Sequence, residues 1–188
     1  MPGGSTEVRR RMSLKLCVVG CGHFARIFAG AMQAIAGEVD LSFASRDAQR
    51  AAEYAAAFNG KASFGSYEAA AADSDVEAMY LCTPHHLHGE HVALAAAAGK
   101  HILVEKPIAR TMEEARLIVQ TANQAGVTLM VAENYRFMAV VRLTKQLIDG
   151  GTLGVLRLIQ LQEEADLRPS QWRASREDSG KDDDYVPG

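Results

Sequence analysis

The chain has 188 residues, which is enough for one full domain and part of a second. Hydrophobic residues make up 48% of it, so we expect a packed core and exclude disorder throughout. The net charge of -3 argues against a general nucleic-acid binder, and no stretch approaches the roughly 20 apolar residues of a membrane helix.

The cysteines and the first residues indicate a compartment. Cys17, Cys21 and Cys82 are odd in number and lack CxxC spacing, which is typical of reduced thiols in the cytosol. The basic run Arg9 to Arg11 is not followed by an apolar segment long enough for a secretory signal. We therefore expect residues 1–12 to be a disordered tail and the protein to be cytoplasmic, without a membrane partner.

Short apolar runs alternate with helical patterns along most of the chain. The predicted strands are 14–19, 39–44, 62–64, 77–82, 101–104 and 127–132. The predicted helices between them are 23–36, an alanine-rich segment ending at about Phe58, 67–72, a segment from Thr83-Pro84 to Ala98, and 111–124. This alternation predicts an α/β fold with a doubly wound parallel sheet of the Rossmann type, over residues 13–134.

The pattern changes beyond Asn134. An amphipathic helix is predicted over 140–148, and one long alternating strand over 153–162. We expect residues 135–188 to be the incomplete beginning of an α+β substrate domain. A single strand cannot bury its apolar face alone, so we expect this segment to stay partly exposed or to drive self-association.

A glycine-rich turn follows the first predicted strand and opens the first predicted helix. Gly20 permits the tight bend, Gly22 lets a pyrophosphate approach the backbone, and Ala25 allows close helix–strand packing. The helix that begins at His23 presents free N–H groups and its positive end to phosphates. A purely structural turn is the simpler alternative, but the strand–turn–helix context favours a dinucleotide cofactor.

The end of the second strand indicates which dinucleotide. An acidic residue there would bind the ribose 2′-hydroxyl of NAD, whereas this chain has Ser45 and Arg46. A hydroxyl and a guanidinium suit a 2′-phosphate, and Asp47 is better explained as a helix N-cap. We therefore predict NADP, with NAD as the second choice. The alternative for Arg46 is a solvated surface charge.

Glu105, Lys106 and Pro107 close the apolar strand over 101–104. Open α/β sheets bind ligands beyond the carboxyl ends of their strands, so Lys106 and the glycine turn are expected in one crevice. There Lys106 could exchange a proton with a carbonyl or an alcohol while a hydride moves to or from nicotinamide. Glu105 could pair with it, contact the cofactor ribose or cap a loop. The alternative for Lys106 is a surface lysine.

Four histidines, His85, His86, His88 and His91, follow Thr83-Pro84. On a helix, His88 and His91 could share a metal because they are three residues apart. No cysteine, aspartate or third rigidly placed histidine completes such a site. We therefore predict histidines at the start of a helix in a polar crevice, and no metal.

Together these motifs resemble the glucose–fructose oxidoreductase/inositol dehydrogenase family (Gfo/Idh/MocA). The segments that carry the resemblance are Gly20 to Ala25, Leu81 to Pro84 with His88, Ala98 to His101, Val104 to Pro107, and Glu133 to Phe137. The resemblance extends from about Leu14 to Trp172. The string around Glu105-Lys106-Pro107 is far more specific than the glycine turn.

The resemblance implies an NAD(P)-dependent oxidoreductase acting on sugars, polyols or related small alcohols and carbonyls. Lys106 matches the family's active-site lysine, and a cis peptide bond is expected between Lys106 and Pro107. Tyr135 and Arg136 would lie at the substrate entrance, while His85 replaces the usual asparagine. The residues expected to contact the cofactor are Gly20, Gly22, His23, Phe24, Ala25, Ser45, Arg46, Cys82, Thr83, Pro84, His88, Glu105 and Lys106.

The last residues depart from the family pattern. After Ser179-Gly180 the family continues through a glycine-rich segment that supplies an Asp and a His to the active site, but this chain reads Lys181 to Asp184 and ends at Gly188. This departure predicts a truncated second domain and negligible turnover by the chain as given. The competing function is a nucleotide-binding module without turnover. A methyltransferase is less favoured, because Arg46 and Lys106 would have no obvious role in one.

Overall fold

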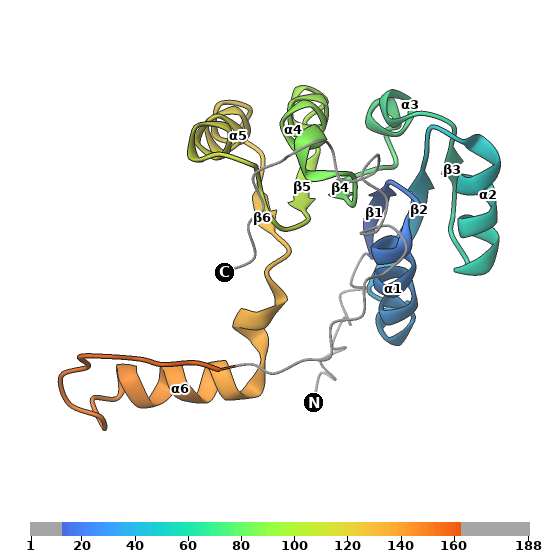
Figure 1. Cartoon of the computed structure of the whole chain (residues 1–188). Coiled ribbons are helices and arrows are strands. Elements are labelled where there is room, and N and C mark those ends of the chain that lie inside the picture. Colours follow the sequence, from blue (N-terminus) through green and yellow to red (C-terminus); the bar gives the residue numbers. More distant parts are fainter. Residues whose placement is uncertain (1–12, 163–188) are drawn as a thin grey trace, which may run out of the picture. The chain divides into compact units, whose positions relative to one another are not determined.

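The structure is a computed structural model that describes residues 13–162. The chain divides into two compact units, with the boundary between Val131 and Ala132. The first unit contains the sheet, and the described part of the second contains a short 3-10 helix and the helix α6 (Ala139–Asp149) (Figure 1). The ending at Lys181 to Gly188, on which the expectation of a truncated domain depends, lies outside the described residues.

The first unit is built on a six-stranded, all-parallel sheet in the order β3-β2-β1-β4-β5-β6. The strands are β1 (Leu14–Val19), β2 (Val39–Ala44), β3 (Ser63–Phe64), β4 (Ala78–Leu81), β5 (His101–Val104) and β6 (Leu129–Val131). The chain winds in one direction from β1 and in the other from β4, so the strand order reverses between these two strands. The predicted doubly wound sheet of the Rossmann type is confirmed.

The helices of the first unit alternate with its strands. They are α1 (His23–Met32), α2 (Ala48–Ala57), α3 (Tyr67–Ala72), α4 (His88–Ala97) and α5 (Met112–Gln124). Figure 1 shows α3, α4 and α5 along one face of the sheet and α1 against the opposite face. Within residues 13–162, no helix is both long enough and apolar enough to cross a membrane.

Two predicted helices are shorter than expected, because tighter 3-10 turns form at their ends. The first helix ends at Met32 and continues as η1 (Gln33–Ile35). The fourth was expected from Thr83, but Pro84 is extended with ψ 139 and caps η2 (His85–Leu87), so α4 begins only at His88. The predicted N-cap of α2 is confirmed, since the Asp47 carboxylate accepts hydrogen bonds from the amides of Gln49 and Arg50.

The core forms because side chains alternate between the two faces of each strand. On the face of α4 and α5, one row across the sheet is fully buried: Ala44, Val19, Leu81 and Val104. On the face of α1, the row through Phe43, Val18 and Tyr80 is aromatic at two of three positions. The Tyr80 ring lies 4.2 Å from that of Phe28 on α1, between ring centroids.

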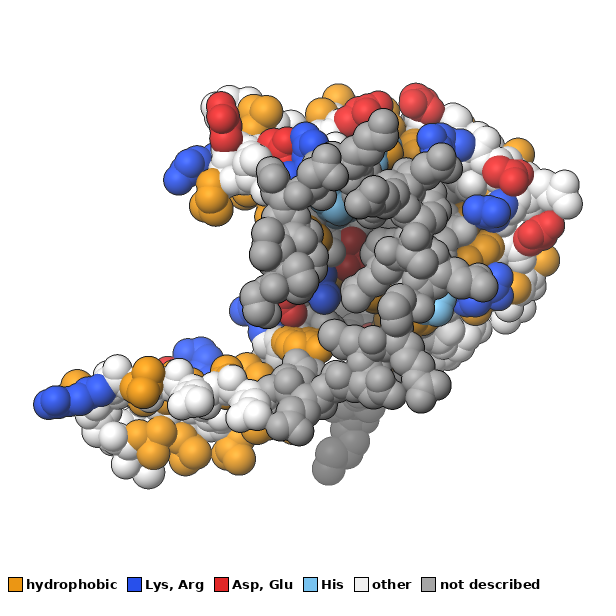
Figure 2. Space-filling view, in the orientation of Figure 1, with side chains coloured by type: hydrophobic (Ala, Val, Ile, Leu, Met, Phe, Trp, Pro, Cys, Tyr) orange, Lys and Arg blue, Asp and Glu red, His pale blue; other side chains and the backbone are white. Residues whose placement is uncertain are grey.

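The second unit contains η3 (Asn134–Phe137) and α6 (Ala139–Asp149), so the predicted amphipathic helix is confirmed. The predicted strand over 153–162 is wrong, because these residues form no strand. Alternation identifies a face that a strand would bury, but the described residues 132–162 supply no neighbouring strand to pair with it. Val155, Leu158 and Leu161 remain more than 80% exposed. Hydrophobic side chains are also visible in the region of α6, among white and blue atoms (Figure 2).

Substitutions at two methionines can test which strands contribute most to the hydrophobic core. Met79 on β4 is fully buried, whereas Met130 on the edge strand β6 is 53% exposed. We expect Met79→Ala to lower the free energy of unfolding by about 2–5 kcal/mol, because it leaves a cavity. Met130→Ala is expected to cost less than about 1 kcal/mol. Urea denaturation followed by circular dichroism measures both, and equal losses would contradict this assignment of the core.

Candidate functional site

Four turns lie along one edge of the sheet, because parallel strands bring their carboxyl ends to the same side. In spatial order they are residues 45–46 after β2, 20–22 after β1, 82–84 after β4 and 105–107 after β5. Adjacent strands are about 4.8 Å apart, so the outermost turns are roughly 14 Å apart. The sheet therefore places the residues that the sequence singled out in the first unit along one short edge.

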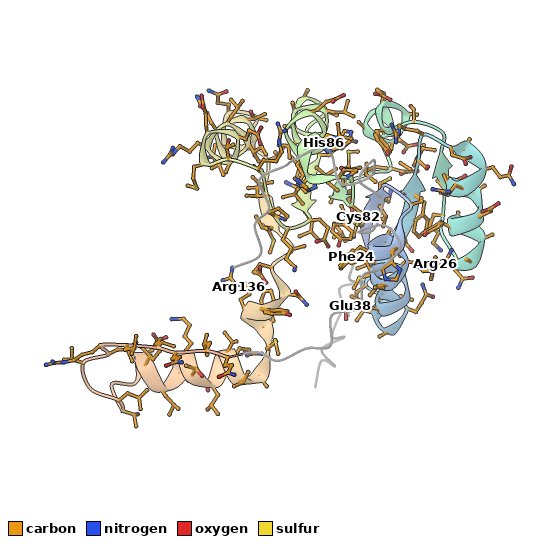
Figure 3. All side chains as sticks on the ribbon, viewed as in Figure 1. Phe24, Arg26, Glu38, Cys82, His86 and Arg136 are labelled. Carbon is orange, nitrogen blue, oxygen red and sulfur yellow. The ribbon has the colours of Figure 1, made fainter. Side chains whose placement is uncertain are left out.

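The glycine turn is sterically tight at its first residue and open at its third. Gly20 has φ +93, and a Cβ atom there would lie 3.0 Å from the carbonyl oxygen of Cys82. Gly22 precedes α1 and has nothing within 4 Å of the position where a Cβ would be, so its backbone is accessible. His23 and Phe24 are exposed on the first turn of α1, whereas Ala25 is fully buried. Figure 3 labels Phe24 on α1 and Cys82 after β4.

Tyr54 on α2 contacts the glycine turn through its hydroxyl group. Its hydroxyl donates a hydrogen bond of 3.0 Å to the carbonyl oxygen of Gly22. The ring packs against Phe43 of β2, and the Arg26 guanidinium lies 4.9 Å from its centroid. Tyr54 was not among the residues predicted from the sequence, although a single aromatic residue in an alanine-rich helix is a signal of a specific contact.

The turn after β2 presents one buried and one exposed polar residue. Ser45 is 7% exposed, and its hydroxyl oxygen accepts the amide of Asp47 at 3.1 Å, which leaves the hydroxyl hydrogen available. Arg46 is exposed. Burial raises the pKa of Tyr67 on α3, and the nearby positive charge of Arg46 opposes that increase. Arg46 therefore lies close to Tyr67, beside the carboxyl end of β2.

Two buried histidines anchor the turn after β4. The Thr83 hydroxyl is 2.8 Å from Nδ1 of His91. His88 is 1% exposed, with Nε2 3.0 Å from the carbonyl oxygen of Thr83 and Nδ1 3.1 Å from that of Pro107. His88 therefore lies between the turn after β4 and the turn after β5 and contacts a backbone carbonyl of each, although a neutral imidazole donates a hydrogen bond to only one of them. Pro84, the next residue along this turn, is exposed.

Glu105 and Lys106 form the turn after β5, and the expected cis bond between Lys106 and Pro107 is confirmed. Lys106 is exposed, and its amide donates to Oε2 of Glu105 at 3.0 Å. The other carboxylate oxygen of Glu105 accepts the hydroxyl of Tyr80. Tyr80 was also not among the residues predicted from the sequence, although its hydroxyl is a polar group within the apolar run of β4.

The thiols along this edge are not activated. Burial raises the pKa of Cys21 to about 11, and its sulfur lies 3.7 Å from the carbonyl oxygen of Ala44. Burial also raises the pKa of Cys82. Both thiols are therefore protonated at neutral pH and line the turns as small apolar groups.

Tyr135 and Arg136 belong to η3 in the second unit. The amide of Tyr135 donates to a carboxylate oxygen of Glu133 at 3.2 Å, and the Arg136 guanidinium lies 5.4 Å from the ring centroid of Phe137. Their expected place at a substrate entrance stays a prediction.

Comparison with known proteins gives one family. The sequence model described as "Oxidoreductase family, NAD-binding Rossmann fold" (GFO_IDH_MocA) matches residues 14–133. These residues include every strand and helix described in the first unit and all four turns of the edge.

Individual relatives are similar over a longer stretch. The chain is 34% identical over 167 residues to mouse trans-1,2-dihydrobenzene-1,2-diol dehydrogenase, which covers 86% of this chain and 50% of the relative. It is 36% identical over 166 residues to 1,5-anhydro-D-fructose reductase of Ensifer adhaerens, covering 87% and 50%. A structure of levoglucosan dehydrogenase with NADH and levoglucosan is similar with a TM-score of 0.71 and 31% identity, covering 76% and 41%. The chain thus spans about half the length of the curated relatives it matches.

The buried histidines predict a pH dependence of stability. Burial lowers the pKa of both His88 and His91 below the ordinary value of 6.5. Below that pH the unfolded chain binds protons that the folded chain does not, so stability is full above about pH 6.5 and falls with further acidification. We expect the urea midpoint to fall between pH 7.5 and pH 5.5.

The matched variants are His91→Asn and His86→Asn, because His91 is buried and His86 is exposed. The pH dependence of the urea midpoint should shrink in the first variant and persist in the second. Identical pH dependences in both variants would show that His91 does not contribute.

Proposed function

Because the chain belongs to the Gfo/Idh/MocA oxidoreductase family with its NAD-binding Rossmann fold, we propose that it binds NADP and acts on a small alcohol or carbonyl of the sugar, polyol or diol class. The observation that carries this proposal is the order of turns along the sheet edge. A cationic turn, a glycine turn and a lysine-bearing turn follow one another, with the turn after β4 between the last two.

The residues present fit a dinucleotide phosphate. The accessible backbone at Gly22 and the first amides of α1 suit the pyrophosphate. Ser45 retains a hydroxyl hydrogen and Arg46 carries a positive charge, and both suit a 2′-phosphate rather than a 2′-hydroxyl. Thr83 and Pro84 would then lie on the nicotinamide side, between the glycine turn and Lys106.

In the proposed reaction, the cofactor supplies or accepts a hydride. Lys106 would give a proton to the substrate oxygen during reduction and take one from it during oxidation. This role is supported by the sheet order, because Lys106 follows β5 and the neighbouring strand β4 leads into Thr83 and Pro84. We further propose that residues 13–134 form the cofactor domain and that Tyr135 and Arg136 open a substrate domain.

Cofactor preference is tested by Arg46→Ala. We expect the wild type to bind NADPH more tightly than NADH, and the variant to lose about ten- to hundredfold in NADPH affinity, as for a lost hydrogen bond between charged groups. NADH affinity should hardly change. Fluorescence titration measures both. Arg116→Ala on α5 is the control, since Arg116 is exposed outside the four turns. Equal affinities of the wild type for the two cofactors would contradict the assignment to NADP.

The acid/base role is tested by Lys106→Ala in an assay of NADP reduction with a panel of sugars, polyols and diols. Any turnover by the wild type should fall by about 10²–10⁴-fold in the variant, the usual contribution of a general acid/base. NADPH affinity should change much less. Turnover that survives in Lys106→Ala would exclude this role. Tight NADPH binding with no reduction across the panel would favour a nucleotide-binding module without turnover.

A further inference from the structure

Tyr80 is a polar residue in the centre of the sheet. It lies on β4 and is only 3% exposed, with its ring against Phe28 of α1. A buried phenol that lacks a hydrogen-bond partner loses the free energy of its hydration, so the hydroxyl requires one. The partner is the Glu105 carboxylate, at the end of the neighbouring strand.

The sheet register explains why these two residues meet. Tyr80 is paired with Leu103 across β4 and β5, and paired residues in parallel strands point to the same face. Glu105 lies two residues beyond Leu103, so the alternation of side chains returns it to the face of Tyr80. The contact therefore results from strand pairing between residues 25 positions apart.

Glu105 connects Tyr80 to the main chain of Lys106. One carboxylate oxygen accepts the Tyr80 hydroxyl, and the other accepts the amide of Lys106 at 3.0 Å. Burial raises the pKa of Tyr80, and the neighbouring Cys82 and Glu105 raise it further. The hydroxyl therefore stays protonated and remains a donor to Glu105 throughout the working pH range.

We propose that Tyr80 is a positioning residue for Lys106. Its hydroxyl holds the Glu105 carboxylate against the main-chain amide of Lys106, and the carboxylate is thereby kept from forming an ion pair with the lysine amine. This inference rests on the proposed acid/base role of Lys106. It assigns a function to a tyrosine of the hydrophobic core that is only 3% exposed.

Substitution of Tyr80 and substitution of Glu105 should have opposite effects on the reactivity of the Lys106 amine. A carboxylate close to an ammonium group makes the lysine hold its proton more tightly, which opposes proton transfer near neutral pH. Tyr80→Phe removes the donor and frees a carboxylate oxygen, so the Lys106 amine should become less reactive. Glu105→Gln removes the negative charge, so the amine should become more reactive.

The experiment measures the amine directly in the full chain. Wild type, Tyr80→Phe, Glu105→Gln and the double variant are treated with limiting amounts of a neutral amine-acylating reagent, and acylation of Lys106 is followed by peptide mass spectrometry. Lys145 on α6, which pairs with Asp149, is the internal reference. NADPH affinity and thermal midpoint are measured on the same samples.

We expect the relative rate at Lys106 to fall about two- to fivefold in Tyr80→Phe, as for a partly exposed charge pair. In Glu105→Gln the rate should rise by less than about twofold, because in the wild type Tyr80 already holds that charge away from the amine. The double variant should match Glu105→Gln, because the hydroxyl acts only through the carboxylate. Changes in the same direction in both single variants would show that Tyr80 merely stabilises the strand, and would overturn the proposal.

Glu114→Gln is the matched control. The Glu114 carboxylate also accepts a backbone amide, that of Arg110 at 3.0 Å, together with a side-chain donor, but it lies on α5. Its removal should leave the rate at Lys106 unchanged. Tyr80→Phe keeps the ring that packs on Phe28. If its thermal midpoint nevertheless falls below the assay temperature, the rates of all four proteins are compared below that midpoint, and an unchanged rate at Lys106 in Tyr80→Phe overturns the proposal.

Failure of this inference and failure of the proposed function give different results. A wild type that does not bind NADPH contradicts the proposed function, while the opposite effects at Lys106 would still support the role of Tyr80. A wild type that binds NADPH, with equal Lys106 rates in all four proteins, contradicts the role of Tyr80 and leaves the proposed function standing.

Discussion

The pairing of β1 with β4 is the constraint on which the rest of the structure depends. It joins the two halves of the sheet at the point where the strand order reverses. It also brings Gly20 so close to Cys82 that a Cβ atom at Gly20 would lie 3.0 Å from the Cys82 carbonyl oxygen, and the φ of +93 would strain any side chain there. The glycine turn, the turn after β4 and the lysine-bearing turn therefore share one edge because of this pairing and that of β4 with β5.

Each of three turns along this edge is held by a ring from another part of the unit. Tyr54 of α2 donates a hydrogen bond to the carbonyl of Gly22, and Tyr80 of β4 donates one to Glu105. His88 of α4 contacts the carbonyls of Thr83 and Pro107. Rings suit this task because they lose little rotamer freedom on burial and carry a polar tip on an apolar body. The edge is thus pre-organised by groups that need not touch a ligand.

The two units differ in how far their apolar side chains are buried. In the first unit, buried rows on the sheet pack against helices on both faces. In the second unit, Val140, Leu143 and Leu147 of α6 are exposed, as are Val155, Leu158 and Leu161 beyond it. The four turns of the sheet edge all belong to the first unit.

The sequence by itself determined the elements of the first unit and the positions of its turns. Local signals suffice there: short apolar runs make strands, and Asp47 and Thr111 cap helices through amides two or three residues away. The same signals placed Lys106 at the end of β5. They failed over 153–162, because alternation describes one strand and a strand forms only with a partner.

Only the tertiary structure decided which side chains hold the edge together. The hydrogen bond from Tyr54 to Gly22 spans 32 positions and the one from Tyr80 to Glu105 spans 25. No local pattern encodes such contacts, because they depend on strand order and on which face of the sheet each residue occupies. Glu105 illustrates the difference: its sequence left several partners open, and the register of β4 with β5 selected Tyr80.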